Sequence, residues 1–267
     1  MAITSLDGYI AAAKQRIRLQ KNAGTSVAAQ WHTLFDRGGQ PGAGSLSIAN
    51  TTTGVVPTDA TAGCPTINAF GGGNTGYLSR VMFSSTVAGR FYLADRLFHA
   101  GSVSATANAT TSLSTQPSYV GRLPGSSYAG LDLWVENNAT VSNNACNVSI
   151  GYRNQANSDV TSATVSIQNF VTGRLVQIPL NAGDTEIKQI NSIIISGTSA
   201  TTGSVNVIVA RPLYLGARVP TASGGDVHGI DRVGLVQVYE DSALWLAYAA
   251  DSTSTGVADC LLEVVNG

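Results

Sequence analysis

The segment Ser204-Val205-Asn206-Val207-Ile208-Val209 begins with strict alternation of polar and apolar side chains. Because successive side chains of a β-strand point to opposite faces, this period of two predicts a strand with one face against a core. The segment Asn147-Val148-Ser149-Ile150 alternates in the same way. Gly, Pro, Asn, Ser and Thr separate such runs from their neighbours, which is typical of sandwiches and barrels.

Similar extended runs continue outward from these two segments along most of the chain. They predict strands at 27–35, 78–84, 90–93, 131–136, 146–152, 163–169, 174–179, 186–196, 204–211, 233–239, 243–250 and 260–265. We therefore expect a mainly β fold: a β-sandwich, jelly-roll-like, with a short N-terminal helix and long irregular loops.

The N-terminal region has the only helical pattern in the sequence. Ser5 or Asp7 can cap a helix over residues 5–19, and the run of alanines at 11–13 favours it. Its basic residues are interpreted either as favourable charge near a helix C-terminus or as a site that docks on an acidic neighbour. These candidate contact residues are Lys14, Arg16, Arg18 and Lys21.

The rest of the chain forms one predicted body. We divide the sequence into an N-terminal helical arm, residues 1–24, and a β-sandwich body, residues 25–267, in which a break near residue 128 would give two subdomains. The stretches 38–76 and 100–128 are rich in small and polar residues and longer than usual loops, so we expect contact arms where a partner orders them and mobile loops where none does.

Composition limits the classes of function. Only 12% of the 267 residues are charged and the formal net charge is −1, which argues against packaging nucleic acid. No apolar run is long enough for a membrane helix, and the basic residues follow rather than precede the first apolar stretch, unlike a secretory signal. The three widely spaced cysteines predict buried or half-buried free thiols in a reducing compartment.

No motif supports catalysis or a cofactor. Residues 71–76 match GxGxxG, but an alternating strand pattern follows instead of a helix, so a glycine-rich turn is predicted. His32, His99 and His228 lack metal-ligand spacing, and the stretch from Asp226 to Asp231 is interpreted as a polar loop, although a His-carboxylate site fits its spacing. We therefore expect no enzyme, no metal and no cofactor.

Most aromatic residues lie within predicted strands, where they would fill a core. Tyr119, Arg122 and Tyr128 lie instead in a segment rich in Gly, Ser and Pro, and are candidate contact residues. An exposed Trp134 or Trp245 would favour a sugar-stacking platform.

Blocks of sequence along the whole chain resemble a family of structural proteins from tailed bacteriophages. They are Leu6-Asp7-Gly8-Tyr9-Ile10-Ala11-Ala12 and those at 54–63, 67–80, 93–98, 121–125 and 241–245. The resemblance implies a virion component without giving its place in the particle.

Within a virion we expect a capsid decoration, or cement, protein that binds the outer surface of the major capsid protein lattice and stabilises the head. It would also contact copies of itself, as a trimer if it follows local icosahedral symmetry, but neither nucleic acid nor membrane. Assembly would take place in the host bacterial cytoplasm. The alternatives are a tail component, such as a tube or terminator subunit, and a carbohydrate-binding fibre or baseplate module.

Overall fold

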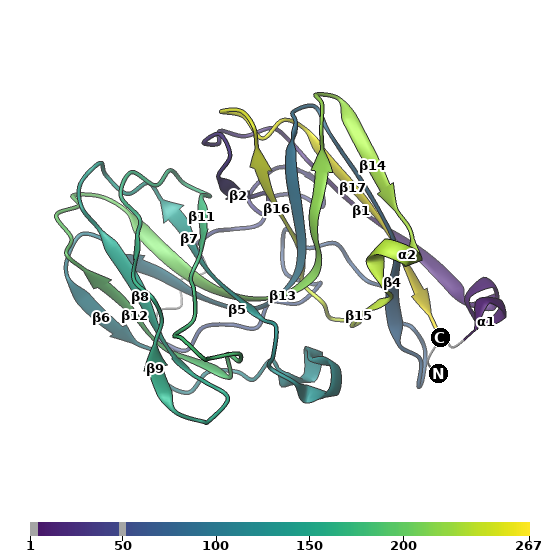
Figure 1. Cartoon of the computed structure of the whole chain (residues 1–267), viewed down its shortest axis with the longest axis horizontal. Coiled ribbons are helices and arrows are strands. Elements are labelled where there is room, and N and C mark those ends of the chain that lie inside the picture. Colours follow the sequence, from purple (N-terminus) through teal and green to yellow (C-terminus); the bar gives the residue numbers. More distant parts are fainter. Residues whose placement is uncertain (1–4, 48–51) are drawn as a thin grey trace.

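The computed structural model describes residues 5–47 and 52–267, and most of its regular structure is β-strand (Figure 1). The described helices are short: α1 is Leu6–Ala11, α2 is Ile230–Val233, and the 3-10 turns η1 and η2 are Val120–Arg122 and Pro124–Ser126. Residues 1–4 of the predicted arm and 48–51 of the predicted loop lie outside the described residues.

Two sheets form a sandwich that we call the first roll. Its outer sheet has the order β14-β4-β17-β1-β3, with β15 also beside β4, and its other sheet has the order β13-β5-β16-β2. The strands are β1 (Ala13–Lys21), β2 (Trp31–Thr33), β3 (Gly39–Gln40), β4 (Gly76–Ser85), β5 (Gly89–Ser104), β13 (Ser204–Val219), β14 (Gly224–His228), β15 (Val236–Val238), β16 (Leu244–Ala250) and β17 (Ala258–Asn266).

The pairing of these strands is that of a jelly roll. Apart from the short β3 and β15, the first strand pairs with the last, β1 with β17, and the second with the seventh, β2 with β16. The third pairs with the sixth, β4 with β14, and the fourth with the fifth, β5 with β13, all antiparallel. One long hairpin rolled into two sheets has this nesting, so the expected jelly-roll-like sandwich is confirmed.

A second jelly roll lies between β5 and β13 in the sequence and shares both strands with the first. Its sheets have the orders β5-β13-β7-β11 and β6-β12-β8-β10, with β9 also beside β8. The same nesting recurs, with β5:β13, β6:β12, β7:β11 and β8:β10 as antiparallel pairs. Its further strands are β6 (Ala109–Ser112), β7 (Asp132–Ala139), β8 (Asn147–Arg153), β9 (Asp159–Thr161), β10 (Val165–Ser166), β11 (Leu175–Gln177) and β12 (Gln189–Ser196).

The shared strands place the division between the two rolls elsewhere than the predicted break near residue 128. Both β5 and β13 are 16 residues long; residues 89–95 of β5 pair with β16 in the first roll, whereas residues 204–210 of β13 pair with β7 in the second. The second roll is thus inserted between the fourth and fifth strands of the first, at the opposite end of the molecule from both termini (Figure 1). No boundary falls near residue 128.

The predicted N-terminal helical arm is also wrong beyond its first turns. The helix ends at Ala11, the backbone of its C-cap residue Ala12 is extended (φ −63°, ψ 139°), and β1 begins at Ala13. In β1, Ile17 and Leu19 are buried whereas Arg16 and Arg18 are exposed. This period of two favours a strand over a helix, and pairing along all of β1 with β17 places the segment inside the first roll.

Each roll has its own core, and a third apolar cluster covers the opposite face of the shared sheet. In that cluster Phe35, Leu46 and Cys64 pack with buried Trp134 and Trp245. The described part of the predicted loop at 38–76 therefore buries side chains against the body. The stretch 100–128 is not one irregular loop, because it contains the end of β5, all of β6, η1 and η2.

A buried ionic group, the junction cluster of Asp95, Arg96, Arg122, Glu136 and Arg211, lies where the shared strands pass from one roll to the other. Arg96 Nη2 donates to Glu136 Oε2 at 2.9 Å, and both side chains are fully buried. The Asp95 carboxylate lies 3.4 Å from Arg122 Nη1 and 3.6 Å from Arg211 Nη2. Glu136 belongs to β7, so the cluster ties the second roll to the shared strands.

Candidate contact surface

The outer sheet of the first roll presents one face to the core and the other to solvent. On β4, Arg80 and Met82 are exposed whereas Val81 and Phe83, between and beyond them, are buried. We call the solvent-facing side of β1, β17, β4 and β14 the outer face. The side chains that define it are Arg16, Arg18, Arg80, Met82, Val227, Asp259 and Leu261.

Strand register places an apolar row across this face. Leu261 is opposite Met82, and Met82 is opposite Val227 on the next strand. Arg18 is opposite Leu261 and ends the row on β1. Met82 is 37% and Val227 54% exposed. A solvent-facing side of an antiparallel sheet is usually polar, so this row is unusual.

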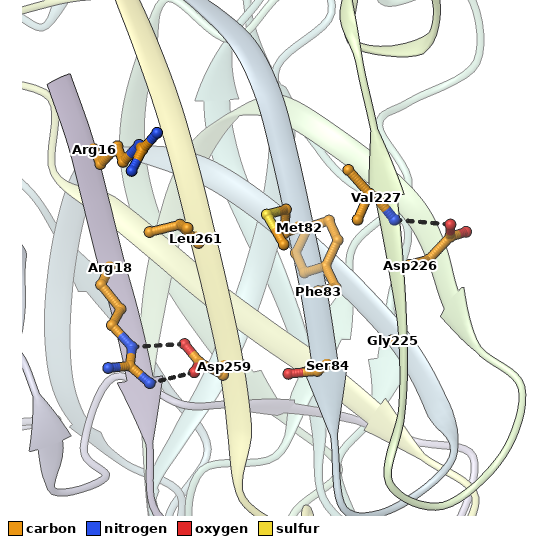
Figure 2. Close-up of a pocket in the computed structure, with 10 residues that line it drawn as sticks. All are labelled: Arg16, Arg18, Met82, Phe83, Ser84, Gly225, Asp226, Val227, Asp259 and Leu261. Carbon is orange, nitrogen blue, oxygen red and sulfur yellow. Dashed lines mark hydrogen bonds and ion pairs between the residues drawn. The ribbon is translucent and has the colours of Figure 1, made fainter. Parts of the chain in front are cut away.

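A groove of about 520 Å³ runs over the apolar row (Figure 2). At one side Arg18 binds Asp259 through two hydrogen bonds, Nε to Oδ1 at 3.1 Å and Nη2 to Oδ2 at 2.5 Å. These hydrogen bonds raise the pKa of Arg18. Glu263 on β17 is opposite Arg16 on β1 and opposite Arg80 on β4. Neither arginine forms an ion pair within residues 5–47 and 52–267. The groove is therefore apolar at its base with unpaired positive charge beside it.

Beside the groove, three side chains form a hydrogen-bonded series. His228 Nε2 lies 2.7 Å from Asp226 Oδ2, and His228 Nδ1 contacts the Tyr214 hydroxyl. The hydrogen bond to His228, and after it the backbone N–H of Val227, lowers the pKa of Asp226, whereas burial raises the pKa of Tyr214. Both ring nitrogens of His228 therefore have hydrogen-bond partners within the chain.

This series corrects the prediction of a polar loop over residues 226–231. Asp226 and His228 end β14, and α2 begins at Ile230. Two residues apart on a strand, the two side chains share one side of the backbone, which the spacing alone could indicate. The partner from β13, Tyr214, has no sequence signal.

Of the predicted contact residues, Arg16 and Arg18 lie on the outer face, and Lys14 lies beside α1. Lys14 Nζ donates to the carbonyl oxygens of Tyr9, Ile10 and Ala12 at 2.9, 3.3 and 3.3 Å. These carbonyls end the helix, so the charge of Lys14 acts at the C-terminus of α1.

Lys21 is a contact prediction that the structure contradicts, because only 1% of the residue is exposed. Its Nζ donates to the carbonyl oxygens of Pro41 at 3.0 Å and Gly42 at 3.1 Å. Burial lowers the pKa of Lys21 to about 8. The residue holds the following loop against β1 and is not available to a partner.

Tyr119 and Arg122, each 3% exposed, are likewise buried rather than available for contact. The Tyr119 hydroxyl donates to the carbonyl oxygen of Ile187 at 2.5 Å, and Arg122 Nη2 donates to that of Arg96 at 2.9 Å. Tyr128 is half-buried, with its ring 5.8 Å from that of Tyr119. The small residues around this segment let it fold onto the core of the second roll.

The buried tryptophans remove the proposed sugar platform. Trp134 is 2% and Trp245 1% exposed, and Trp245 Nε1 donates to Thr33 Oγ1 at 2.8 Å. Neither ring presents a face to solvent, so neither can stack on a sugar.

Two further predictions, the glycine-rich turn and the buried thiols, agree with the structure. Residues 71–75 contain the turn and Gly76 begins β4, and the three cysteines are buried free thiols. Burial raises the pKa of Cys64 to about 11. Among the described residues, no three His, Cys, Asp or Glu side chains gather as a metal site. Across residues 5–47 and 52–267, no helix is long and apolar enough to cross a membrane.

Comparison with known proteins adds little to this geometry. No protein-family model matches the sequence, and no curated protein matches it. Among solved structures, the chain is similar to that of the infectious bursal disease virus Gt strain, with 10% identity and a TM-score of 0.18 over 95% of this chain and 81% of that one. The infectious bursal disease virus VP2 subviral particle gives 11% identity and a TM-score of 0.17 over 96% and 80%. Similarity this weak carries no argument about function.

Proposed function

We propose that this protein is a structural component of a virus particle and that it works by contact with neighbouring subunits rather than by catalysis. The observation that carries the proposal is the nested pair of jelly rolls, because the jelly roll is a fold of viral capsid domains. The sequence blocks that resemble structural proteins of tailed bacteriophages support the same proposal. A fold alone does not fix function, so the proposal also relies on the outer face.

Within the virion, we propose a capsid decoration protein on the head of a tailed bacteriophage. The outer face offers an apolar row with unpaired arginines, which suits contact with another protein. The second roll extends away from the termini and would project from the contact (Figure 1). Repeated copies on a lattice would convert weak single contacts into firm attachment.

In this role the partners are the major capsid protein and further copies of this chain, and the location is the outer surface of the head. We propose no nucleic-acid partner, because the net charge is −1 and the phosphate contacts of nucleic-acid binding need an excess of basic groups, and we propose no membrane partner.

The test is attachment of the purified protein to heads of the phage that encodes it. Expanded, empty heads that lack the protein are mixed with it and pelleted, and unexpanded heads serve as the control. We expect saturable co-sedimentation with the expanded heads. Self-assembly into hollow tubes, or recovery of the native protein only with isolated tails, would instead favour the tail component.

A further inference from the structure

Helix α1 leaves its apolar side chains uncovered. Leu6 is 71% and Ile10 64% exposed, and no residue of α1 is buried. Four residues apart, the two side chains lie on the same side of the helix. A six-residue helix is marginal in water without packing of its apolar face, so this face lacks the contact that would stabilise it.

The body fixes where α1 lies without covering that face. Ser5 accepts a hydrogen bond from the Gly8 N–H at 3.0 Å, and Lys14 donates to the carbonyls at the other end. The Tyr9 hydroxyl donates to Glu263 Oε1 at 3.1 Å and pins the helix beside β17. The apolar pair thus points outward from a fixed position.

The outer face has the complementary chemistry. Its groove offers an apolar base to Leu6 and Ile10, and Arg16 and Arg80 offer unpaired positive charge to Asp7, the acidic residue of α1. The helix and the groove together account for much of the large hydrophobic surface that the described residues expose.

We propose that α1 of one copy of this chain seats in the outer-face groove of a second copy. In the contact, Leu6 and Ile10 cover the apolar row, and Asp7 lies near Arg16 and Arg80, outside the position of Glu263 between them. The helix of the same copy does not occupy the groove. This helix ends before Ala13, and Arg18, at the end of the apolar row, lies five residues beyond Ala13 on β1. Five residues of strand span roughly 17 Å.

The contact places different surfaces of the two copies against each other. Two copies can exchange helices as a closed pair, or successive copies can close a ring. It rests on the proposed function only for its setting in a virion, because self-association is measured on the purified protein without heads.

The test uses two variants that change only exposed side chains. The helix variant carries Leu6→Ser with Ile10→Ser, and the groove variant carries Met82→Ser with Val227→Ser. Leu215→Ser is the matched control, because Leu215 is 61% exposed but belongs to β13, outside the outer face. Sedimentation equilibrium measures self-association of each, and circular dichroism checks that each is folded.

We expect wild type and the control to self-associate equally. Each variant should associate at least about 100-fold more weakly, because the contact loses the burial of two aliphatic side chains. In an equimolar mixture, the groove variant supplies an intact helix and the helix variant supplies an intact groove. The two variants should therefore form a one-to-one complex with each other. Asp7→Arg should weaken association, and addition of Arg16→Asp with Arg80→Asp should restore it.

A wild-type protein that stays monomeric at high concentration would overturn the proposal. So would folded variants that associate like wild type, or a variant mixture that forms no complex. If the groove variant is monomeric alone, binds no helix variant and fails to attach to heads that the helix variant still binds, the groove serves a capsid subunit instead, and only this inference fails. If self-association behaves as expected but heads are not bound, the decoration role fails instead.

Discussion

Glu136→Gln should destabilise the protein strongly, although it changes one atom. Glu136 Oε2 accepts from Arg96 Nη2 at 2.9 Å and from Asn206 Nδ2 at 3.0 Å, in a site with no solvent exposure of either charged side chain. Glutamine keeps the size but removes the negative charge, so the Arg96 guanidinium stays buried without its counter-ion. Among the described atoms, Arg96 Nε and Nη1 already lack hydrogen-bond partners. Removing one partner of a buried ion pair costs about 3 to 5 kcal/mol.

Urea unfolding at pH 7, followed by tryptophan fluorescence, measures this loss. Asp159→Asn is the control, because Arg153 and Asp159 form an exposed pair at 2.9 Å, and water screens an exposed pair, so its loss should change stability far less than loss of the buried pair. Combining Arg96→Met with Glu136→Gln should recover much of the loss, since no buried charge is then left alone. A loss below about 1 kcal/mol for Glu136→Gln would refute the assignment of a buried ion pair at the junction.

Three further predictions concern buried groups. Burial lowers the pKa of His32 to about 4, below the value of roughly 6.5 in an unfolded chain, so the unfolded state binds more protons and stability should fall as pH drops from 6.5 toward 4. The urea midpoint against pH measures this, and His32→Gln should flatten that slope; an equal slope in both proteins would contradict it. The three buried thiols should react with a thiol reagent only after unfolding, and fast reaction of the native protein would show that they are accessible. Tyr119→Phe should lower the free energy of unfolding by about 1 to 3 kcal/mol, because the Ile187 carbonyl loses its buried donor, and an unchanged urea midpoint would exclude that hydrogen bond.

The strands of the fold could be read from the sequence because alternation marks them. Each predicted strand range overlaps an observed strand, whereas β1, β3, β6, β9 and β14 were missed. The longest of these, β1, contains Arg16-Ile17-Arg18-Leu19, whose period of two is clear, but the alanines before it suggested that a helix continued. The nesting of the two rolls could not be predicted from the sequence, because it depends on pairing between strands that are far apart in the sequence.

The candidate contact residues show the limit of residue type as a guide. Arg16 and Lys21 are both basic and lie on the same strand, yet Arg16 is exposed whereas Lys21 is buried, with 1% of the residue exposed. Their positions on β1 differ by five, so they lie on opposite faces. Met82 and Val227 carry no signal of their own, because only the pairing of β4 with β14 brings them together.

The most direct test of the central claim, that this nested pair of jelly rolls is a contact subunit on the outside of a virion, is an electron-microscopy map of the particle in which strands are resolved. The account predicts two-lobed density on the head, with the outer face covered by a neighbouring subunit and the second roll projecting outward. Density in the tail, or an outer face open to solvent in every copy, would contradict it.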